Sequence, residues 1–193
     1  MKGHKAFKKG LVCRGKRYAE NTVFEESFDF ASQNIKSQIE ASDSTRFADD
    51  NNAELVCGNN AMLVGGHNTK LVGGNGAILV GGDNTKLVGG IYAILTGGYN
   101  ATVVGDCGST LMGGNNAVLV GDYATKLIGG NNSIIVGNNG STVKGKKGSV
   151  IVLVERDGNL SIVNFKAVQV DGEKIKEDVL YRLKNGEFVE VKE

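Results

Sequence analysis

The central part of the chain is a repeat of eight residues. From Asn51 to Val154 the sequence divides into thirteen consecutive octads without an insertion. The fifth position of every octad is Leu, Ile or Val, and the third is always Ala, Ser or Thr. The seventh position is Gly in eleven octads and differs only at Cys57 and Leu153. Self-similarity at a fixed short period indicates a solenoid, so this repeat constrains the fold before any local pattern does.

Each octad predicts a short strand followed by a corner. Paired glycines every eight residues argue against an amphipathic helix, because glycine in a helix interior is strongly destabilising. We therefore expect a strand over positions three to six and a Gly/Asn corner whose backbone visits positive φ. Strand alternation places positions three and five on one face and positions four and six on the other. Position four includes Lys and Glu, so its face must point outward and the Ala/Ser/Thr and Leu positions must form a thin core.

The fourth position sets the expected length of one coil. In the stretch HNTKLVGGNGAILVGG (67–82), Lys70 of one octad gives way to Ile78 of the next. This alternation predicts two octads per coil, which makes an all-β fold: a flattened β-solenoid with about 16 residues per coil and two sheets back to back. Thirteen octads make six and a half coils. At about 4.8 Å per rung the stack is roughly 30 Å tall.

Sorted by face, the fourth positions predict two apolar patches on opposite faces and at opposite ends of the stack. One face carries Glu54, Lys70, Lys86 and Thr102, and then Val118, Ile134 and Val150. The other carries Met62, Ile78 and Ile94, and then Thr110, Lys126 and Thr142. Exposed apolar patches need a cover. We expect either the chain's own ends, with 1–50 over the Met62 patch and 155–193 over the Val118 patch, or a homodimer or partner interface.

The segments on either side of the repeat, residues 1–50 and 155–193, are predicted to form caps. Residues 1–50 are expected to form an N-terminal cap, with a small β-element in 1–26, a short helix over 31–41 and a polar linker into the first octad. In residues 155–193, turn signals at Asp157-Gly158, Asp171-Gly172 and Asn185-Gly186 separate β-prone runs. This pattern predicts a C-terminal β-meander cap, because such dipeptides favour hairpin turns.

Both ends also carry a family resemblance. The segment KAFKKGLVCRGKRYAENTVFEE (5–26) resembles the opening of an uncharacterised family found in phages and prophages, and GSVIVLVERDGN (148–159) with KAVQVDGEKIKEDVLYRLKNGEFVEV (166–191) resembles its closing module. In that family the ends flank octads similar to the repeats of bacterial ice-nucleation proteins. This chain departs from the pattern in its Leu-Val-Gly-Gly octads, in a shortened 27–50 segment and in Val150, where a Trp is common. The resemblance implies a capped octad solenoid of phage origin, and the family has no established activity.

Composition argues against several classes of partner and compartment. A net charge of +1, from 22 basic and 21 acidic residues, favours neither nucleic acid nor a membrane surface. No run approaches the ~20 apolar residues of a membrane span, and the basic start lacks the apolar region of a signal peptide. Three widely spaced cysteines without a C-x-x-C indicate reduced thiols. We therefore expect a cytoplasmic protein, in the host cytoplasm if it is phage-encoded.

No catalytic, metal or cofactor site is predicted. The two histidines, His4 and His67, have no partner at the spacing of a nucleophilic triad, and the scattered cysteines do not match a metal site. Residues 140–147 approach a phosphate-binding loop, but Lys147 stands where that loop requires Ser or Thr. No octad has Thr at both positions four and six, the arrangement that a flat ice-binding face would present.

The sequence therefore predicts a non-catalytic, phage-type β-solenoid scaffold that acts through protein–protein contacts, with itself or a host protein as partner. Alternatives are a phage inhibitor of a host defence protein, and an ice-binding or virion/adhesin structural module. The candidate polar residues are Lys70, Lys86 and Lys126. The candidate interface residues are Met62, Ile78, Ile94, Val118, Ile134, Val150, Ile91, Tyr92, Tyr99 and Tyr123.

Overall fold

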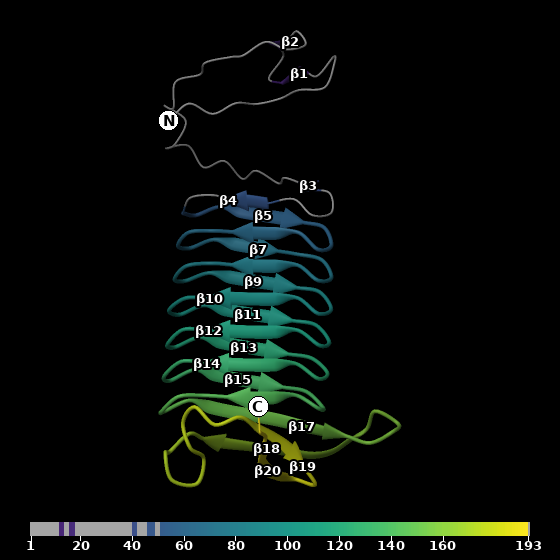
Figure 1. Cartoon of the computed structure of the whole chain (residues 1–193), viewed down its shortest axis with the longest axis vertical. Coiled ribbons are helices and arrows are strands. Elements are labelled where there is room, and N and C mark those ends of the chain that lie inside the picture. Colours follow the sequence, from purple (N-terminus) through teal and green to yellow (C-terminus); the bar gives the residue numbers. More distant parts are fainter. Residues whose placement is uncertain (1–11, 14–15, 18–39, 42–45, 49–50, 193) are drawn as a thin grey trace. The chain divides into compact units, whose positions relative to one another are not determined.

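The computed structural model describes residues 12–13, 16–17, 40–41, 46–48 and 51–192, with side chains described from residue 51 onward. The chain divides into two units, residues 1–35 and 36–193. In the first unit, β1 (Val12–Cys13) and β2 (Lys16–Arg17) form an antiparallel pair. The second unit is a β-solenoid of about six turns, and no described residue is helical. Figure 1 shows its coils stacked one above the next.

The solenoid consists of two nine-stranded sheets, and successive octads alternate between them. We name as sheet I the sheet that contains β3 (Glu40–Ala41), β5 (Glu54–Cys57), β7 (Lys70–Val72), β9 (Lys86–Gly89), β11 (Thr102–Gly105), β13 (Val118–Gly121), β15 (Ile134–Gly137), β17 (Val150–Arg156) and β18 (Ile162–Gln169). We name as sheet II the sheet that contains β4 (Arg46–Ala48), β6 (Met62–Val64), β8 (Ile78–Val80), β10 (Ile94–Gly97), β12 (Thr110–Gly113), β14 (Lys126–Gly129), β16 (Thr142–Lys144), β19 (Tyr181–Lys184) and β20 (Glu187–Glu190).

The predicted coil of 16 residues is confirmed by the strand register. Neighbouring rungs pair in parallel at an offset of 16, as in Leu55 with Leu71 and Leu63 with Leu79. The same offset continues before the first octad, because Glu40 pairs with Val56 and Arg46 with Met62. Parallel pairing therefore begins before residue 51, inside the segment where the sequence predicted a cap and linker. Of the helix expected over 31–41, residues 31–39 lie outside the described residues, and Glu40 and Ala41 form β3.

The core is a column of aliphatic side chains between the two sheets. The fifth-position residues are almost completely buried, as predicted, and the small third-position residues lie beside them. The buried hydroxyl groups of the third position are paired with backbone carbonyls: Thr69 Oγ1 donates to Gly66 O, and Ser149 Oγ donates to Gly130 O. Among the described residues, no buried side-chain polar atom lacks a hydrogen-bond partner. The polar side chains of the described interior are thus paired within the protein.

Glycine and asparagine have two separate roles at the corners. The second position of every octad has positive φ, and this position is most often Asn, as at Asn84 with φ 55°. The seventh-position glycines face inward instead and have no positive φ. A Cβ added at Gly73 would lie 2.6 Å from the Cβ of Ala77, so this glycine provides space rather than an unusual backbone conformation.

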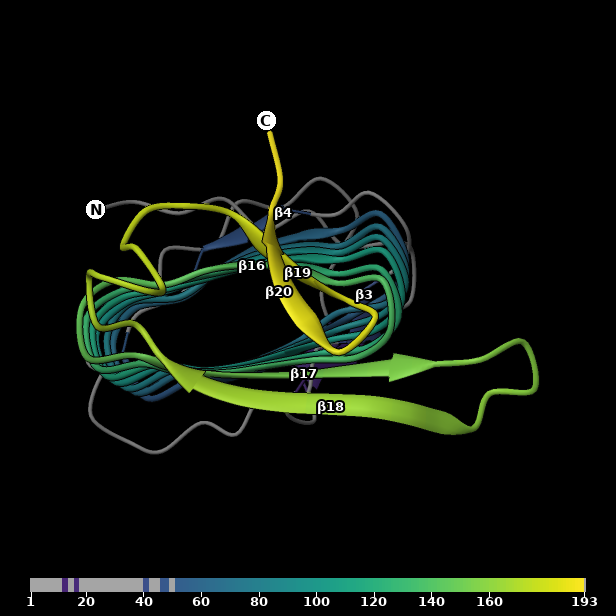
Figure 2. The ribbon, with the colours of Figure 1, turned by 90° about the horizontal axis from the view of Figure 1, so that it is seen from below.

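The C-terminal tail extends both sheets in the antiparallel sense. Strand β18 pairs with β17, and the β19–β20 hairpin joins sheet II beside β16. Seen from below, β19 and β20 cross the end of the stack, and the tip of the β17–β18 hairpin projects past the coils (Figure 2). Val170 and Tyr181 are buried at 1% and 3% exposure, so the tail closes this end of the core.

A carboxylate fastens the cap to sheet I. The two oxygens of Glu155 accept hydrogen bonds from the backbone N–H of Asn185 and of Gly186 at 3.0 Å, and from Asn164 Nδ2 at 2.8 Å. The bond from the Asn185 backbone, followed by those from the Asn164 side chain and the Gly186 backbone, holds the pKa of Glu155 below its ordinary value. Because the ionised form accepts all three bonds, this clamp requires a charged carboxylate.

Candidate protein-binding face

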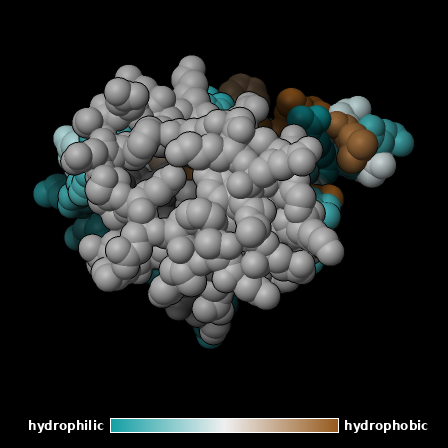
Figure 3. Space-filling model, turned by 90° about the horizontal axis from the view of Figure 1, so that it is seen from above, coloured by the Kyte–Doolittle hydropathy of each residue, from teal (hydrophilic) through white to brown (hydrophobic). Residues whose placement is uncertain are grey.

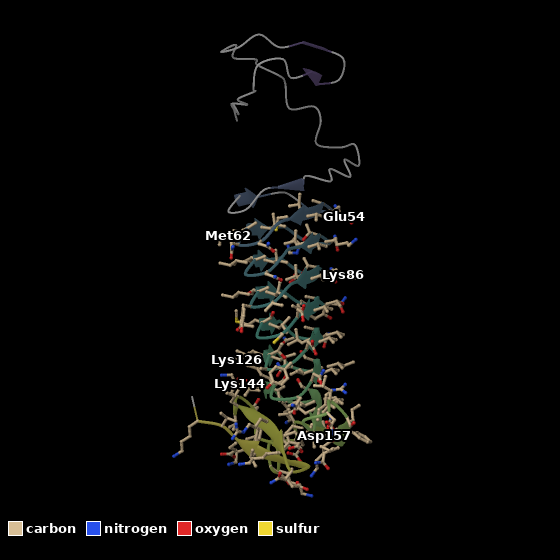
Figure 4. The ribbon with its side chains drawn as sticks, turned by 90° about the vertical axis from the view of Figure 1, so that its right-hand side faces the viewer. Glu54, Met62, Lys86, Lys126, Lys144 and Asp157 are labelled. Carbon is tan, nitrogen blue, oxygen red and sulfur yellow. The ribbon has the colours of Figure 1, made fainter. Side chains whose placement is uncertain are left out.

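The outer surface of sheet I consists of two columns of side chains that run along the stack. The register places Lys70 beside Lys86, Thr102 beside Val118, and Ile134 beside Val150, so the predicted change from charged to apolar residues along one face is confirmed. The sixth positions form the second column, which is valine in every octad of this sheet: Val56, Val72, Val88, Val104, Val120, Val136 and Val152. Figure 4 shows Glu54 and Lys86 on this face, opposite Met62, Lys126 and Lys144.

The half of this surface nearer the C-terminus is apolar and open. We name it the apolar face; it comprises Val118, Val120, Ile134, Val136, Val150, Val152, Val154, Phe165 and Ala167. The side chains of Ile134, Val150 and Phe165 are 47%, 39% and 75% exposed. The prediction that residues 155–193 cover this patch is therefore wrong.

The reason is the register of β18. Phe165 lies opposite Val154, and Ala167 lies opposite Val152, so both share the outer face of β17. Residues directly opposite in an antiparallel pair point to the same side of the sheet. The tail thus lengthens the sheet in its own plane and enlarges the apolar face, whereas a cover would have to pack across it.

An open groove of about 340 Å³ lies along one side of the apolar face. Four valines contribute to its lining: Val104, Val120, Val136 and Val154. A polar ladder borders it: Asn138 Nδ2 donates to Asp122 Oδ1 at 2.8 Å, and Arg156 Nε donates to Asn138 Oδ1 at 3.0 Å. Neither Asp122 nor Arg156 was among the sequence candidates, because the ladder exists only once residues 16 or more apart are stacked.

The hairpin beyond this groove adds further apolar surface. Leu160, Ile162 and Val163 are 72%, 55% and 51% exposed. In the view from above, hydrophobic surface gathers at the upper right, where this hairpin projects (Figure 3). None of these three residues was among the sequence candidates. The β-prone run of residues 161–165 predicted a strand, but the exposure of its side chains depends on which strand it pairs with.

The second predicted patch lies on sheet II, with Met62, Ile78 and Ile94 in one column. Ile94 is 43% exposed, and Val64 in the neighbouring column is 38% exposed. The predicted cover for this patch, residues 1–50, lies outside the residues whose side chains are described. The patch is smaller than the apolar face, because the column continues into Thr110 and Lys126.

The tyrosine candidates are divided between two corners. Ile91 and Tyr92 lie on the same corner as Cys107 and Tyr123, because Tyr92 N donates to Cys107 O and Gly108 N donates to Tyr123 O. Tyr99 belongs to the opposite corner, where its backbone N–H donates to Asp83 Oδ1 at 2.8 Å. Tyr92 is 70% exposed and has φ 57°, a conformation that costs a residue with a Cβ roughly 1–2 kcal/mol.

The lysine candidates also lie on two faces. Lys70 Nζ contacts Glu54 Oε1 at 2.6 Å in the neighbouring rung of sheet I, and Lys86 follows Lys70 in the same column. Lys126 is in sheet II, between Thr110 and Thr142. These three lysines show that a fourth position accepts a charged side chain without disturbing the core.

His67 and Cys57 are two further titratable side chains in the described part of the chain. His67 Nδ1 accepts a hydrogen bond from the backbone N–H of Asp83 at 3.1 Å, as one step of a corner ladder. Burial raises the pKa of the Cys57 thiol, which makes it a poor nucleophile. Across the described ranges, no three His, Cys, Asp or Glu side chains lie close enough together to hold a metal ion. The same ranges contain no helix of the length and apolar character that crossing a membrane requires.

Comparison with known proteins adds no family: no protein-family profile, no curated protein and no solved structure matches this chain.

Proposed function

We propose that this protein is a non-catalytic binding scaffold and that its apolar face docks a protein partner. The observation that carries the proposal is an uncharged area of several rungs, from Val118 to Phe165, with three side chains between 39% and 75% exposed. Exposed apolar areas of this extent, rimmed by polar residues, are typical of interaction sites. The rim here is the Asp122–Asn138–Arg156 ladder on one side and Lys86 further along the stack.

The scaffold suits this task because its surface is rigid. Each inner rung is hydrogen-bonded to the rungs above and below, and the core contains no unpaired polar side chain among the described residues. A pre-organised surface loses little conformational entropy when a partner binds. In a phage setting, which the chain ends suggest by resemblance, the partner is a host protein, and a protein of host defence is one candidate.

The test uses the tolerance of fourth positions for lysine. The full-length protein is immobilised as wild type, as Ile134→Lys and as Ile94→Lys, and proteins retained from host lysate are identified and re-tested in purified form. Ile134→Lys places a charge at the centre of the apolar face, and Ile94→Lys is the matched change on sheet II. Both variants should fold, because Lys86 and Lys126 occupy equivalent positions.

We expect one partner to bind wild type and Ile94→Lys with equal affinity, and to bind Ile134→Lys at least tenfold more weakly. A partner that binds Ile134→Lys as well as wild type would refute docking on the apolar face. Loss with Ile94→Lys alone would assign the interface to sheet II.

A further inference from the structure

The end of sheet I is an unprotected strand edge. Four strands end the two sheets in the described part of the chain: β3, β4, β18 and β20. Strands β3 and β4 have two and three residues, and β20 has four with Glu187 and Glu190 at its ends. Strand β18 has eight residues, most of them exposed and only one of them charged. Proteins normally shorten or charge such edges, because a long apolar edge pairs with other strands.

The direction of the free backbone groups follows from two hydrogen bonds. The backbone N–H of Val150 donates to Ser133 O, so the backbone groups of Val150 point toward β15. The backbone N–H of Val170 donates to Ser149 O, so the backbone groups of Val170 point toward β17. Backbone groups alternate sides along a strand. Phe165, Ala167 and Gln169 therefore direct their N–H and C=O groups toward the open edge of β18.

We propose that β18 pairs antiparallel with β18 of a second copy of this chain, about a two-fold axis at Phe165. This register places Phe165 opposite Phe165 of the second copy on the outer side. It also places Ala167 opposite Val163, the residue at which β18 departs from regular alternation. On the inner side it places Lys166 opposite Asn164 of the second copy, which keeps the two lysines apart. The strand is thus complementary to itself, as a two-fold interface requires.

The charge and the exposed apolar side chains of this edge agree with a second copy as the occupant. Lys166 already forms an ion pair with Glu187 of its own cap, so the edge carries no unbalanced charge. Leu160, Ile162, Val163 and Phe165 are each more than half exposed. Edge pairing brings these side chains beside those of the second copy, and their cross-strand contacts add to the hydrogen bonds of the paired backbones.

Pairing would also join the two apolar faces. Because sheet I of one copy continues into sheet I of the other, the face from Val118 to Phe165 would be doubled across the two-fold axis. This dimer does not depend on the proposed docking function, since it is held by backbone pairing at the edge of β18, although Phe165 and Ala167 belong to the apolar face as well.

The experiment measures the mass of the full-length protein by sedimentation equilibrium over a hundredfold range of concentration. Ala167→Pro removes one edge-facing N–H and leaves the β17–β18 bonds intact, since proline is tolerated on edge strands. Ala167→Ser is its control, because it keeps the N–H. Phe165→Lys places two charges together at the axis, and Ile134→Lys perturbs the apolar face two rungs from the edge.

We expect wild type, Ala167→Ser and Ile134→Lys to be dimers, and Ala167→Pro and Phe165→Lys to dissociate at least thirtyfold more readily. At a concentration low enough for wild type to be monomeric, the two edge variants should melt at the wild-type temperature, because dimer formation itself stabilises the folded state. In the wild type, the amides of Phe165 and Ala167 should gain protection from hydrogen exchange as concentration rises. A monomeric wild type would overturn the proposal. So would a dimer that survives both edge changes, or one that Ile134→Lys dissociates, which would indicate stacking of two apolar faces.

Discussion

The seventh-position glycines provide the most direct test of how this core is packed. A Cβ added at Gly89 would lie 2.7 Å from the Cβ of Ala93 and 2.9 Å from Leu95 Cδ2. Real carbon atoms do not approach so closely, and Ala93 immediately precedes β10, the next strand of the same coil, so the two sheets must separate locally. We expect Gly89→Ala to reduce the free energy of unfolding by about 2 kcal/mol, the usual cost of overpacking by one carbon. That loss corresponds to roughly 4–8 °C in melting temperature.

A double-mutant cycle identifies the cause. Ala93→Gly alone should cost roughly 1–2 kcal/mol, because a buried carbon is lost and the strand gains a glycine. In the double variant the two sites exchange their Cβ, so the total cost should fall at least 1 kcal/mol below the sum of the single costs. Gly158→Ala is the control, since nothing lies within 4 Å of its added Cβ.

The assay is urea unfolding followed by circular dichroism at 25 °C. A change below about 0.5 kcal/mol for Gly89→Ala would refute the reasoning, and so would strict additivity in the cycle. Either result would mean that these glycines are present for a reason other than space.

Three further outcomes are expected. Gly140→Ala should lower the free energy of unfolding by about 1 kcal/mol, because the φ of Gly140 is +73°. No clash contributes, since the nearest atom would lie 3.8 Å from the added Cβ. Gly140→Asn should be nearly neutral in the same urea assay. Because the pKa of Glu155 is lowered in the folded state, its hydrogen bonds stabilise the cap above the unfolded pKa of about 4. This stabilisation is lost as pH falls through the folded pKa. Amide exchange in the β19–β20 turn should therefore accelerate in that pH range. Glu155→Gln should show that faster exchange already at pH 7, and unchanged exchange would contradict the clamp. In a Cys13→Ser background, Cys107 should react with a maleimide well before Cys57, whose burial raises its pKa; equal rates would contradict this.

Much of the solenoid could be predicted because each octad repeats the same pattern of small, aliphatic and glycine positions. Leu63, Leu71 and Leu79 must face inward once the strand period is two, and the alternation of Lys70 with Ile78 then assigns octads to sheets. These inferences use contacts at one fixed offset, so a single sequence is sufficient. The same reasoning did not extend to β3 and β4, which join the stack without the octad pattern.

The tail could not be predicted to the same depth. Its turn signals at Asp157 and Asn185 correctly indicated hairpins, but the choice between continuing a sheet and covering its face depends on packing between distant residues. The irregularity between Glu155 and Arg156 shifts the β18 register by one residue, which changes the face of every residue beyond it.

The sequence by itself determined the coil length, the sheet assignment and the core, because a strict repeat makes local and global order the same. Only the tertiary structure decided that Phe165 faces outward, that Arg156 caps a ladder from Asp122, and that β18 leaves an open edge. These features arise where the repeat ends. Within the repeat each strand pairs with the strand 16 residues away, whereas in the cap the pairing partner is decided by the free energy of the whole packed cap.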